Sequence, residues 1–246
     1  MSEKKEVLLQ LRGVKTFFPV RSGFFNKVTD YVQAVNDIDL DIYKGETLGL
    51  VGESGCGKTT LGKSMIQLVK ATDGTMIYDF GPENGGKKDL RKLDKEGEKL
   101  LHQKLQIVFQ DPYSSLNPAF TIYQSLADPL SQFGIKNKEE QRKLIGDILE
   151  AVNMRREYMD RYPHEFSGGQ RQRIGIARAL MVNPEMVVCD EAVSALDVSI
   201  QAQVLNLLLK LKEERNLTYI FITHNLSVVE YISDRIAVMY LGRIVE

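Results

Sequence analysis

A glycine-rich stretch that contains a lysine and two threonines is the part of this chain best suited to chemistry. It fits the pattern G-x-x-x-x-G-K-[ST]. In such a loop, successive backbone N–H groups and the dipole of the following helix hold anionic oxygens. Lys58 adds a charge that can reach the β- and γ-phosphates of a nucleotide, and the Thr59 hydroxyl can ligate Mg²⁺. We therefore predict that a nucleotide binds here. The residues assigned to it are Gly52, Glu53, Ser54, Gly55, Cys56, Gly57, Lys58, Thr59 and Thr60.

Two acidic residues stand directly after an apolar run. Asp190 and Glu191 follow residues 186–189, which are typical of a buried strand. Open α/β sheets bind ligands at the carboxyl ends of their strands, so this position suits a nucleotide site. Asp190 would hold Mg²⁺, usually through water, and Glu191 could polarise a water toward the γ-phosphate. The alternative is a pair of solvated loop acids.

A second glycine-rich turn lies at 167–170, before another helical pattern. It consists of Ser167, Gly168, Gly169 and Gln170. Alone it predicts no more than a helix cap, although a helix N-terminus can also take phosphate. A chain with two such turns and one nucleotide is explained if the second turn serves the nucleotide of another copy.

The elements that position the first loop are a strand and a helix. Residues 47–51 are a short apolar run bounded by glycine, which predicts a buried strand. Apolar residues recur at helical spacing from Leu61 to Val69, so a helix should begin near Lys58.

The N-terminal part of the chain predicts strands and turns. Residues 8–18 alternate loosely and end at Pro19, as an edge strand does, and residues 21–31 predict a loop. Residues 35–42 predict a half-exposed strand. Asp73 and Gly74 predict a turn before a short strand at 75–78.

The middle of the chain changes character twice. Residues 81–104 predict a solvated excursion with a short helix near 98–104, followed by a strand at 105–109. Residues 112–166 lack strand signals and carry apolar residues four apart, which predicts a helical lobe.

The C-terminal part alternates helices with strands. After the apolar strand at 186–189 we expect a helix at 200–211, a strand at 219–223, a further helix, and strands at 235–240 and 243–245. Such alternation predicts an α/β fold with a mostly parallel sheet covered on both faces.

Composition bounds the function classes. The chain has 246 residues with 43% hydrophobic and 26% charged residues, which suits one soluble domain with an inserted lobe. A net charge of −1 gives no reason to expect nucleic acid as a partner. No run of apolar residues is long enough to span a membrane, so we expect a cytoplasmic location. Cys56 and Cys189 are too few for a zinc site, and a bond between them is not expected in a reducing cytosol.

Taken together, the motifs resemble those of the ATP-binding cassette (ABC) ATPases, from Leu8 to Glu246. The matching segments, in chain order, are 52–60, Gln110, 166–170, 187–191, 194–197 and His224. The resemblance implies a P-loop NTPase (RecA-like) fold: a mostly parallel sheet core, an antiparallel β edge and an inserted α-helical lobe. It also implies one nucleotide-binding domain over 1–246, with its core at 1–111 and 167–246 and its lobe at 112–166.

The resemblance also implies roles for single residues. Glu191 would be the general base, His224 would contact the γ-phosphate, and Gln110 would contact Mg²⁺ and water and sense the lobe. Phe18 would stack on the adenine, with Phe17 and Tyr31 as rivals.

A second cassette is implied as a partner, either an identical copy or a paralogue. ATP on the phosphate loop of one copy would be capped by Ser167, Gly168, Gly169 and Gln170 of the other. Asp197 would lie at the seam between the two copies.

Two longer segments resemble one subfamily, the oligopeptide/dipeptide importer ATPases, which includes nickel and glutathione importers. They are residues 110–118 and 194–203. This resemblance implies peptide uptake driven by ATP and Mg²⁺ through two membrane permease subunits, at the cytoplasmic face of the membrane. An extracytoplasmic solute-binding protein would act indirectly. The lobe would receive a permease helix, with Tyr113, Leu116 and Phe120 as surface candidates, although core packing of the lobe explains any one of them better.

Two features depart from the subfamily. Ala192 stands where these proteins usually have proline after the catalytic glutamate, and we expect only a small effect on loop rigidity. The sequence ends at Glu246, where the subfamily normally continues into a C-terminal extension, so that extension is expected to be absent.

Two rival functions remain at this point. A soluble ABC ATPase of DNA repair or translation would tend to carry two cassettes or a long coiled-coil insertion, and the sequence shows neither. A nucleotide-dependent scaffold without hydrolysis is disfavoured by Glu191 and His224.

Overall fold

The computed structural model describes residues 6–22, 26–111 and 116–246. The chain divides into two compact units. The first contains residues up to 101 together with 220–246, and the second contains residues 102–219. The predicted division into a core and a lobe at 112–166 stays a prediction.

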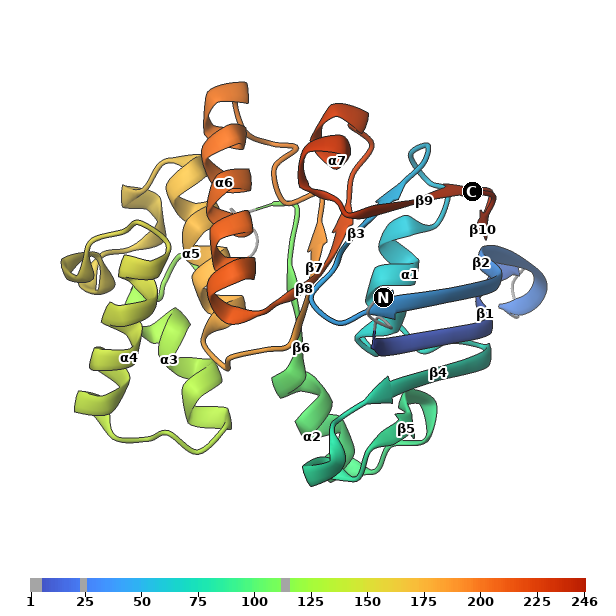
Figure 1. The fold of residues 1–246 in the computed structure, drawn as a ribbon, viewed down its shortest axis with the longest axis horizontal. Coiled ribbons are helices and arrows are strands. Elements are labelled where there is room, and N and C mark those ends of the chain that lie inside the picture. Colours follow the sequence, from blue (N-terminus) through green and yellow to red (C-terminus); the bar gives the residue numbers. More distant parts are fainter. Residues whose placement is uncertain (1–5, 23–25, 112–115) are drawn as a thin grey trace, which may run out of the picture. The chain divides into compact units, whose positions relative to one another are not determined.

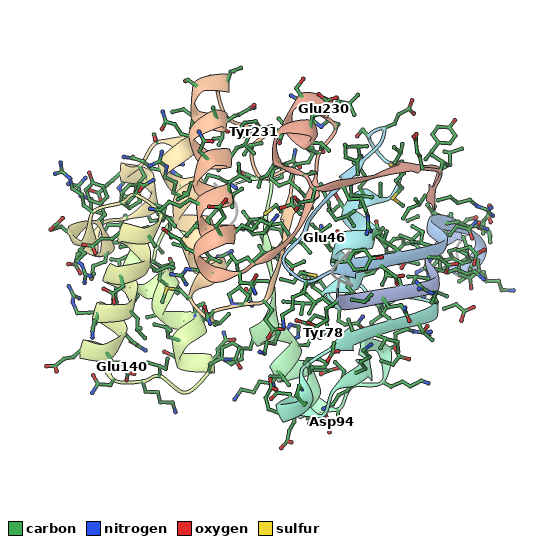
Figure 2. The ribbon with its side chains drawn as sticks, viewed as in Figure 1. Glu46, Tyr78, Asp94, Glu140, Glu230 and Tyr231 are labelled. Carbon is green, nitrogen blue, oxygen red and sulfur yellow. The ribbon has the colours of Figure 1, made fainter. Side chains whose placement is uncertain are left out.

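The first unit contains an antiparallel sheet in the order β2-β1-β4-β5 (Figure 1). Its strands are β1 (Val7–Ser22), β2 (Lys27–Tyr43), β4 (Asp73–Asp79) and β5 (Lys87–Asp89). Leucine and valine side chains on the inner face of β1 are fully buried. Tyr78 of β4, labelled in Figure 2, is also buried and meets the ring of Phe80 edge-on at 4.8 Å.

The other strands of this unit form a separate parallel arrangement. β3 (Thr47–Val51) pairs in parallel with β9 (Arg235–Tyr240), and β10 (Arg243–Ile244) returns antiparallel to β9. β8 (Thr218–Ile222) begins in the second unit and ends in the first, where the N–H of Thr223 donates to the Leu50 carbonyl at 3.3 Å. Every residue of β3 is buried, so this strand is central.

Short helices complete the first unit. α1 (Lys58–Met65) follows β3, and α7 (Leu226–Ile232) follows β8. Two 3₁₀ turns, η1 (Pro82–Asn84) and η2 (Leu90–Lys92), lie between β4 and α2 (Lys95–Lys104), which continues into the second unit. Figure 2 labels Asp94, whose carboxylate accepts a hydrogen bond from the Gly97 N–H at 2.8 Å and so caps the start of α2.

The second unit is built on two parallel strands. β6 (Leu105–Val108) pairs with β7 (Met186–Asp190), with Val108 opposite Cys189. All five residues of β7 are buried. At the other end of the strands, the Lys104 ammonium lies 2.6 Å from the Glu185 carboxylate.

Helices make up most of the second unit. They are α3 (Ile122–Gln132), α4 (Lys138–Ala151), α5 (Gly168–Leu180) and α6 (Val198–Arg215), with the 3₁₀ turns η3 (Arg156–Asp160) and η4 (Pro163–Glu165). α3 and α4 lie side by side (Figure 1). A buried amide joins them: Gln141 accepts from the Tyr123 hydroxyl at 2.7 Å and donates to the Ser131 Oγ at 2.9 Å. No helix among the described residues is both long and apolar enough to cross a membrane.

Most predicted elements are confirmed, and the two exceptions in β1 and β2 share one cause. The predicted loop at 21–31 is wrong for 21–22 and 27–31, because β1 runs to Ser22 and β2 already begins at Lys27, and residues 23–25 lie outside the described residues. β1 also continues through Pro19, where we expected it to stop. Beyond Lys15, β1 pairs with β2 alone, and a strand with one free side tolerates a residue without an N–H.

Three smaller corrections concern strand and helix ends. The predicted turn at Asp73 and Gly74 is the start of β4, and strand β5 was not predicted. α1 ends at Met65, and Leu68, which we had placed in that helix, is 53% exposed.

Candidate active site

The phosphate loop joins β3 to α1, as the motif requires. Gly57 is the N-cap of α1, with φ of 108°. A Cβ there would lie 1.9 Å from the Ala34 carbonyl oxygen of β2, so only glycine fits. No side chain caps α1, and its first turn has no acidic residue. The N-terminal end of α1 is therefore positive and lacks a capping side chain, so it suits a phosphate group.

Lys58 lies within this loop. Its side chain is buried, with the residue 5% exposed, and its Nζ donates to the carbonyls of Gly52 at 2.8 Å and Glu53 at 2.7 Å. The same ammonium is 3.8 Å from the Cys56 Sγ. The backbone thus holds the positive charge inside the loop. Cys56 and Cys189 are both free and buried.

The turn between β9 and β10 supports the phosphate loop. The sequence analysis did not predict this contact. The Gly242 N–H donates to the Cys56 carbonyl at 2.9 Å, and the Gly242 carbonyl accepts from the Asn36 N–H at 2.7 Å. A Cβ at Gly52 would lie 2.0 Å from the Met239 carbonyl oxygen. The only sequence signal was Gly242 itself, whose φ of 81° a larger residue would resist.

His224 follows the end of β8, in the first unit. Thr223 is hydrogen-bonded to Leu50 of β3, and β3 leads into Gly52 one residue after its end. His224 is exposed, and Asn225 next to it caps α7 by accepting from the Ser227 N–H at 3.0 Å. The chain direction therefore brings His224 to the end of β3 from which the loop begins.

The aromatic candidates lie on opposite sides of β1. Thr16 places its Oγ 3.1 Å from the Ser64 Oγ of α1, so this side of β1 faces α1. Phe18, two residues on, shares that side and is 41% exposed. Phe17 lies on the other side, as does Tyr31, which pairs with Pro19. The choice among Phe18, Phe17 and Tyr31 stays a prediction.

The second unit brings Gln110 and Glu191 together. Both lie two residues beyond the paired Val108 and Cys189, and the Gln110 Nε2 donates to the Glu191 Oε2 at 2.8 Å. Glu191 has a φ of 49°, so the chain turns sharply as it leaves β7. Its carbonyl accepts from the Ser194 N–H at 3.1 Å and from the Ser194 Oγ at 3.0 Å. These bonds hold the turn that presents the carboxylate.

Asp190 ends the buried strand, and the residue is 6% exposed. Cys189 before it is fully buried. Burial, and secondarily the charge of Asp190, raises the pKa of the Cys189 thiol to about 12. The Cys189 thiol is therefore neutral and serves in packing. Asp190, which follows it, is the residue of this strand that is suited to chemistry.

The second glycine-rich turn caps α5. Ser167 and Gln170 form a reciprocal capping box: the Gln170 N–H donates to the Ser167 Oγ at 3.3 Å, and the Ser167 N–H donates to the Gln170 Oε1 at 3.0 Å. A Cβ at Gly169 would lie 2.5 Å from the Ile200 Cγ2 of α6. The helix-cap role is observed here, and a role toward another copy's nucleotide stays a prediction.

Asp197 is the N-cap of α6 by backbone geometry. Its carbonyl accepts from the N–H groups of Ile200 at 2.9 Å and Gln201 at 2.8 Å, but its carboxylate does not cap the helix. The residue is exposed beside Val198, which is 82% exposed. An exposed acid of this kind suits a contact with another molecule.

Comparison with known proteins assigns the family. Residues 35–194 match the family described as ABC transporter. The chain belongs to the ABC transporter family. It is an ATP-binding subunit that hydrolyses ATP to drive transport.

Two relatives from Bacillus subtilis (strain 168) resemble the ABC ATPase along almost its whole length. This chain is 49% identical over 243 residues to the oligopeptide transport ATP-binding protein AppF, and the match covers 98% of this chain and 72% of the relative. It is 51% identical over 242 residues to the oligopeptide transport ATP-binding protein OppF, covering 98% and 75%. The glutathione import ATP-binding protein GsiA of Salmonella typhimurium is 50% identical over 241 residues, which cover 38% of that protein.

A solved structure confirms the predicted fold class. The ABC ATPase matches the ATP-binding cassette MJ0796 with a TM-score of 0.81 and 29% identity, over 97% of each chain. That structure is described as a dimer in a post-hydrolysis state, bound to ADP and Pi. The fold is therefore the ABC cassette: a P-loop NTPase with a mixed, mainly parallel sheet, an antiparallel β subdomain and a helical lobe.

The predicted site residues of the ABC ATPase fall into two groups. The first unit carries Phe18, residues 52–60 and His224, and the second carries Gln110, Ser167–Gln170, Asp190, Glu191 and Asp197. Their roles stay predictions. Of the surface candidates for a permease, Tyr113 lies outside the described residues and Phe120 is 46% exposed. Leu116 is 2% exposed and packs in the interior, so for this residue the alternative of core packing holds and it is not a surface candidate.

Proposed function

We propose that this ABC ATPase energises the import of oligopeptides. Its strongest support is the similarity, close to half of all positions, to two proteins whose names state oligopeptide transport. The chemistry rests on one observation above all: a buried lysine held inside a glycine loop, at the uncapped N-terminus of α1.

ATP binding is assigned to the first unit. The phosphates lie against the N–H groups of residues 52–60, and Lys58 exchanges its carbonyl partners for phosphate oxygens. The Thr59 hydroxyl would hold Mg²⁺, and Phe18 would stack on the adenine from its exposed side of β1.

Mg²⁺ is the metal that the oxygen-rich donor set fits. Thr59, Gln110 and Asp190 offer a hydroxyl, an amide carbonyl and a carboxylate, and hard oxygen donors of this kind suit Mg²⁺. No cluster of three or more His, Cys, Asp or Glu that could hold a metal ion lies in the described ranges. In nucleotide sites Mg²⁺ takes much of its coordination from phosphate and water. When bound, Mg²⁺ neutralises charge on the β- and γ-phosphates.

Glu191 is the general base for hydrolysis. Its carboxylate accepts a proton from water while the water oxygen bonds to the γ-phosphorus. The bond between that phosphorus and the β,γ-bridging oxygen breaks, which leaves ADP and inorganic phosphate. The proton then passes from Glu191 to solvent or product, and His224 contacts the γ-phosphate as it transfers.

The partners are a second cassette and the membrane subunits of the importer. Ser167, Gly168, Gly169 and Gln170 of one copy cap the ATP of the other, and Asp197 lies at the seam. The second cassette is an identical copy or a paralogue. Two permease subunits place the ATPase at the cytoplasmic face of the membrane, and a solute-binding protein delivers the peptide.

Purification of the protein with its native partners tests this function. The tagged ATPase is captured from detergent-solubilised membranes of its own host, and the bound proteins are identified by mass spectrometry. We expect two multi-span permease subunits, a cassette ATPase and a solute-binding protein. Ribosomal or DNA-repair proteins without permeases would refute the transport function and leave the ATPase chemistry standing. Steady-state phosphate release from the purified chain separates an ATPase from a scaffold without hydrolysis.

A further inference from the structure

A buried pair of hydroxyl groups joins β1 to α1 in the first unit. Thr16 of β1 is 1% exposed and Ser64 of α1 is 0% exposed, and their hydroxyl oxygens lie 3.1 Å apart. The Ser64 hydroxyl also donates to the Thr60 carbonyl at 2.9 Å. A serine hydroxyl has a single proton to donate, so Thr16 is the donor in the pair. Two hydrogen bonds therefore run in sequence from Thr16 through Ser64 to Thr60, the last residue assigned to the phosphate loop.

The pair lies where β1 loses the support of one neighbouring strand. β1 pairs with β4 from Leu9 to Lys15, and in the described residues beyond Lys15 it pairs with β2 alone. A ribbon of two strands is marginally stable in water unless other elements hold it. Phe18, the residue proposed to stack on the adenine, belongs to this ribbon and is 41% exposed. The contact between Thr16 and Ser64 therefore holds the start of the ribbon against α1.

A second contact fixes the main chain on both sides of Thr16. The Thr72 N–H donates to the Lys15 carbonyl at 2.7 Å, and the Thr72 hydroxyl accepts from the Phe17 N–H at 2.9 Å. Thr72 stands directly before β4, so it extends that side of the sheet by one residue. With its main chain held in this way, Thr16 keeps its side chain toward α1, which lies against β1 and β2.

The two ends of these hydrogen bonds serve the two ends of one ligand. Phe18 lies two residues after Thr16 on the same side of β1, where the base is proposed to bind. Thr60 lies in the first turn of α1, where the phosphates are proposed to bind. In ATP the base and the phosphates are joined covalently. Both ends therefore bind well only if the protein presets the separation between them.

We propose that Thr16 and Ser64 are positioning residues for ATP, whose hydroxyl pair sets how far Phe18 lies from the phosphate loop. The inference rests on the proposed ATP site. Neither residue of the pair touches the nucleotide. Lys58 is held by two carbonyls of its own loop and does not depend on the pair. Loss of the pair should therefore weaken the contact with the base and spare the contact with the phosphates.

Calorimetric titration of the full chain with ATP and with inorganic triphosphate, each with Mg²⁺, tests the proposal. Thr16→Val keeps the shape of the side chain and removes the hydroxyl. It should raise the dissociation constant of ATP about fivefold or more, the size of a weakened stacking contact, and leave that of triphosphate unchanged. Thr16→Ser keeps a hydroxyl at this position and should bind ATP as the unmodified chain does.

Thr47→Val is the matched control for the loss of a buried threonine hydroxyl. Thr47 is fully buried at the start of β3, and its hydroxyl has no hydrogen-bond partner within the described residues. The same substitution there breaks no hydrogen bond of the side chain. The affinities for ATP and for triphosphate should therefore both stay unchanged.

Further variants test the route from the pair to the base. Ser64→Ala leaves the Thr16 hydroxyl buried without this partner and should weaken ATP binding as Thr16→Val does. Because the two hydroxyls form one contact, Thr16→Val/Ser64→Ala should lose no more than either single variant. In a Phe18→Ala background, Thr16→Val should have no further effect on ATP binding, since the side chain through which it acts is gone.

Other results would overturn the proposal. Equal losses for ATP and triphosphate would mean that the pair only supports the phosphate loop. Additive losses in the Phe18→Ala background would mean that the pair does not act through Phe18, and an equal loss in Thr47→Val would show a general effect of the substitution. A melting temperature well above that of the titration shows that a variant is folded, and Ser64→Ala carries the test if Thr16→Val is not.

The unmodified chain separates this proposal from the proposed function. If it binds ATP more tightly than triphosphate and Thr16→Val keeps that difference, only the positioning role is refuted. If it binds both ligands equally, the base makes no contact, and the positioning role fails while the phosphate loop stands. If it binds neither ligand, the ATP site itself is refuted, and the positioning role with it.

Discussion

The Gln110 amide donates a hydrogen bond to the Glu191 carboxylate over 2.8 Å. The two residues come from neighbouring parallel strands and meet because Val108 and Cys189 are in register. The amide orients the group that must accept a proton from water. A residue that is also expected to sense the lobe is thus bonded directly to the proposed base.

This contact predicts a loss of rate when Gln110 is shortened. Gln110→Ala should lower kcat about tenfold or more with a smaller change in KM, because the variant loses orientation of the base and not ATP binding. Steady-state phosphate release measures both. Gln106→Ala on the same strand is the matched control. Within the described residues the Gln106 side chain hydrogen-bonds only to the His102 carbonyl, so this variant should leave kcat unchanged.

Lys58 is predicted to be required for nucleotide binding. Lys58→Ala removes a buried charge aimed into the loop and should weaken ATP binding about a hundredfold or more. Calorimetric titration with ATP measures the effect, and Lys63→Ala in the same helix is the control. Unchanged ATP affinity in Lys58→Ala would refute the loop assignment.

Phe18 is predicted to bind the base and not the phosphates. Phe18→Ala should lose about 1–3 kcal/mol of ATP binding free energy through lost stacking. Its affinity for inorganic triphosphate, which has no base, should not change. A larger loss in Tyr31→Ala than in Phe18→Ala would show that the base lies on the opposite side of β1.

Gly57 is predicted to be needed for stability as well as for binding. Gly57→Ala should lower the free energy of unfolding by more than about 2 kcal/mol, because its Cβ would collide with the Ala34 carbonyl and φ is positive. Gly55→Ala has the same backbone strain, with φ of 81°, but no atom within 4 Å, so it should cost less. Denaturant melts of both variants give the comparison, and equal losses would mean that the collision does not occur.

Local sequence patterns predicted those elements whose structure depends mainly on residues close to them in the sequence. The strand at 47–51 was predicted to the residue, because glycines bound a run whose every member is buried. The start of α1 at Lys58 followed from the same logic. The fold class and the motif order came from the resemblance, which the family match confirms.

The misses depend on contacts between distant residues. Nothing local in residues 21–31 reveals that β1 and β2 extend each other by pairing, so a polar stretch looked like a loop. The support of the phosphate loop by Met239 and Gly242 joins segments almost two hundred residues apart.

The most direct test of the central claim is the Glu191→Gln variant, studied with ATP and Mg²⁺. The substitution keeps the shape of the side chain and removes the base. We predict ATP affinity close to that of the unmodified chain and phosphate release lowered about a hundredfold or more. We also predict a dimer that forms only when ATP is present, seen by light scattering. Phosphate release at the unmodified rate would show that Glu191 is not the base and would contradict the mechanism proposed here.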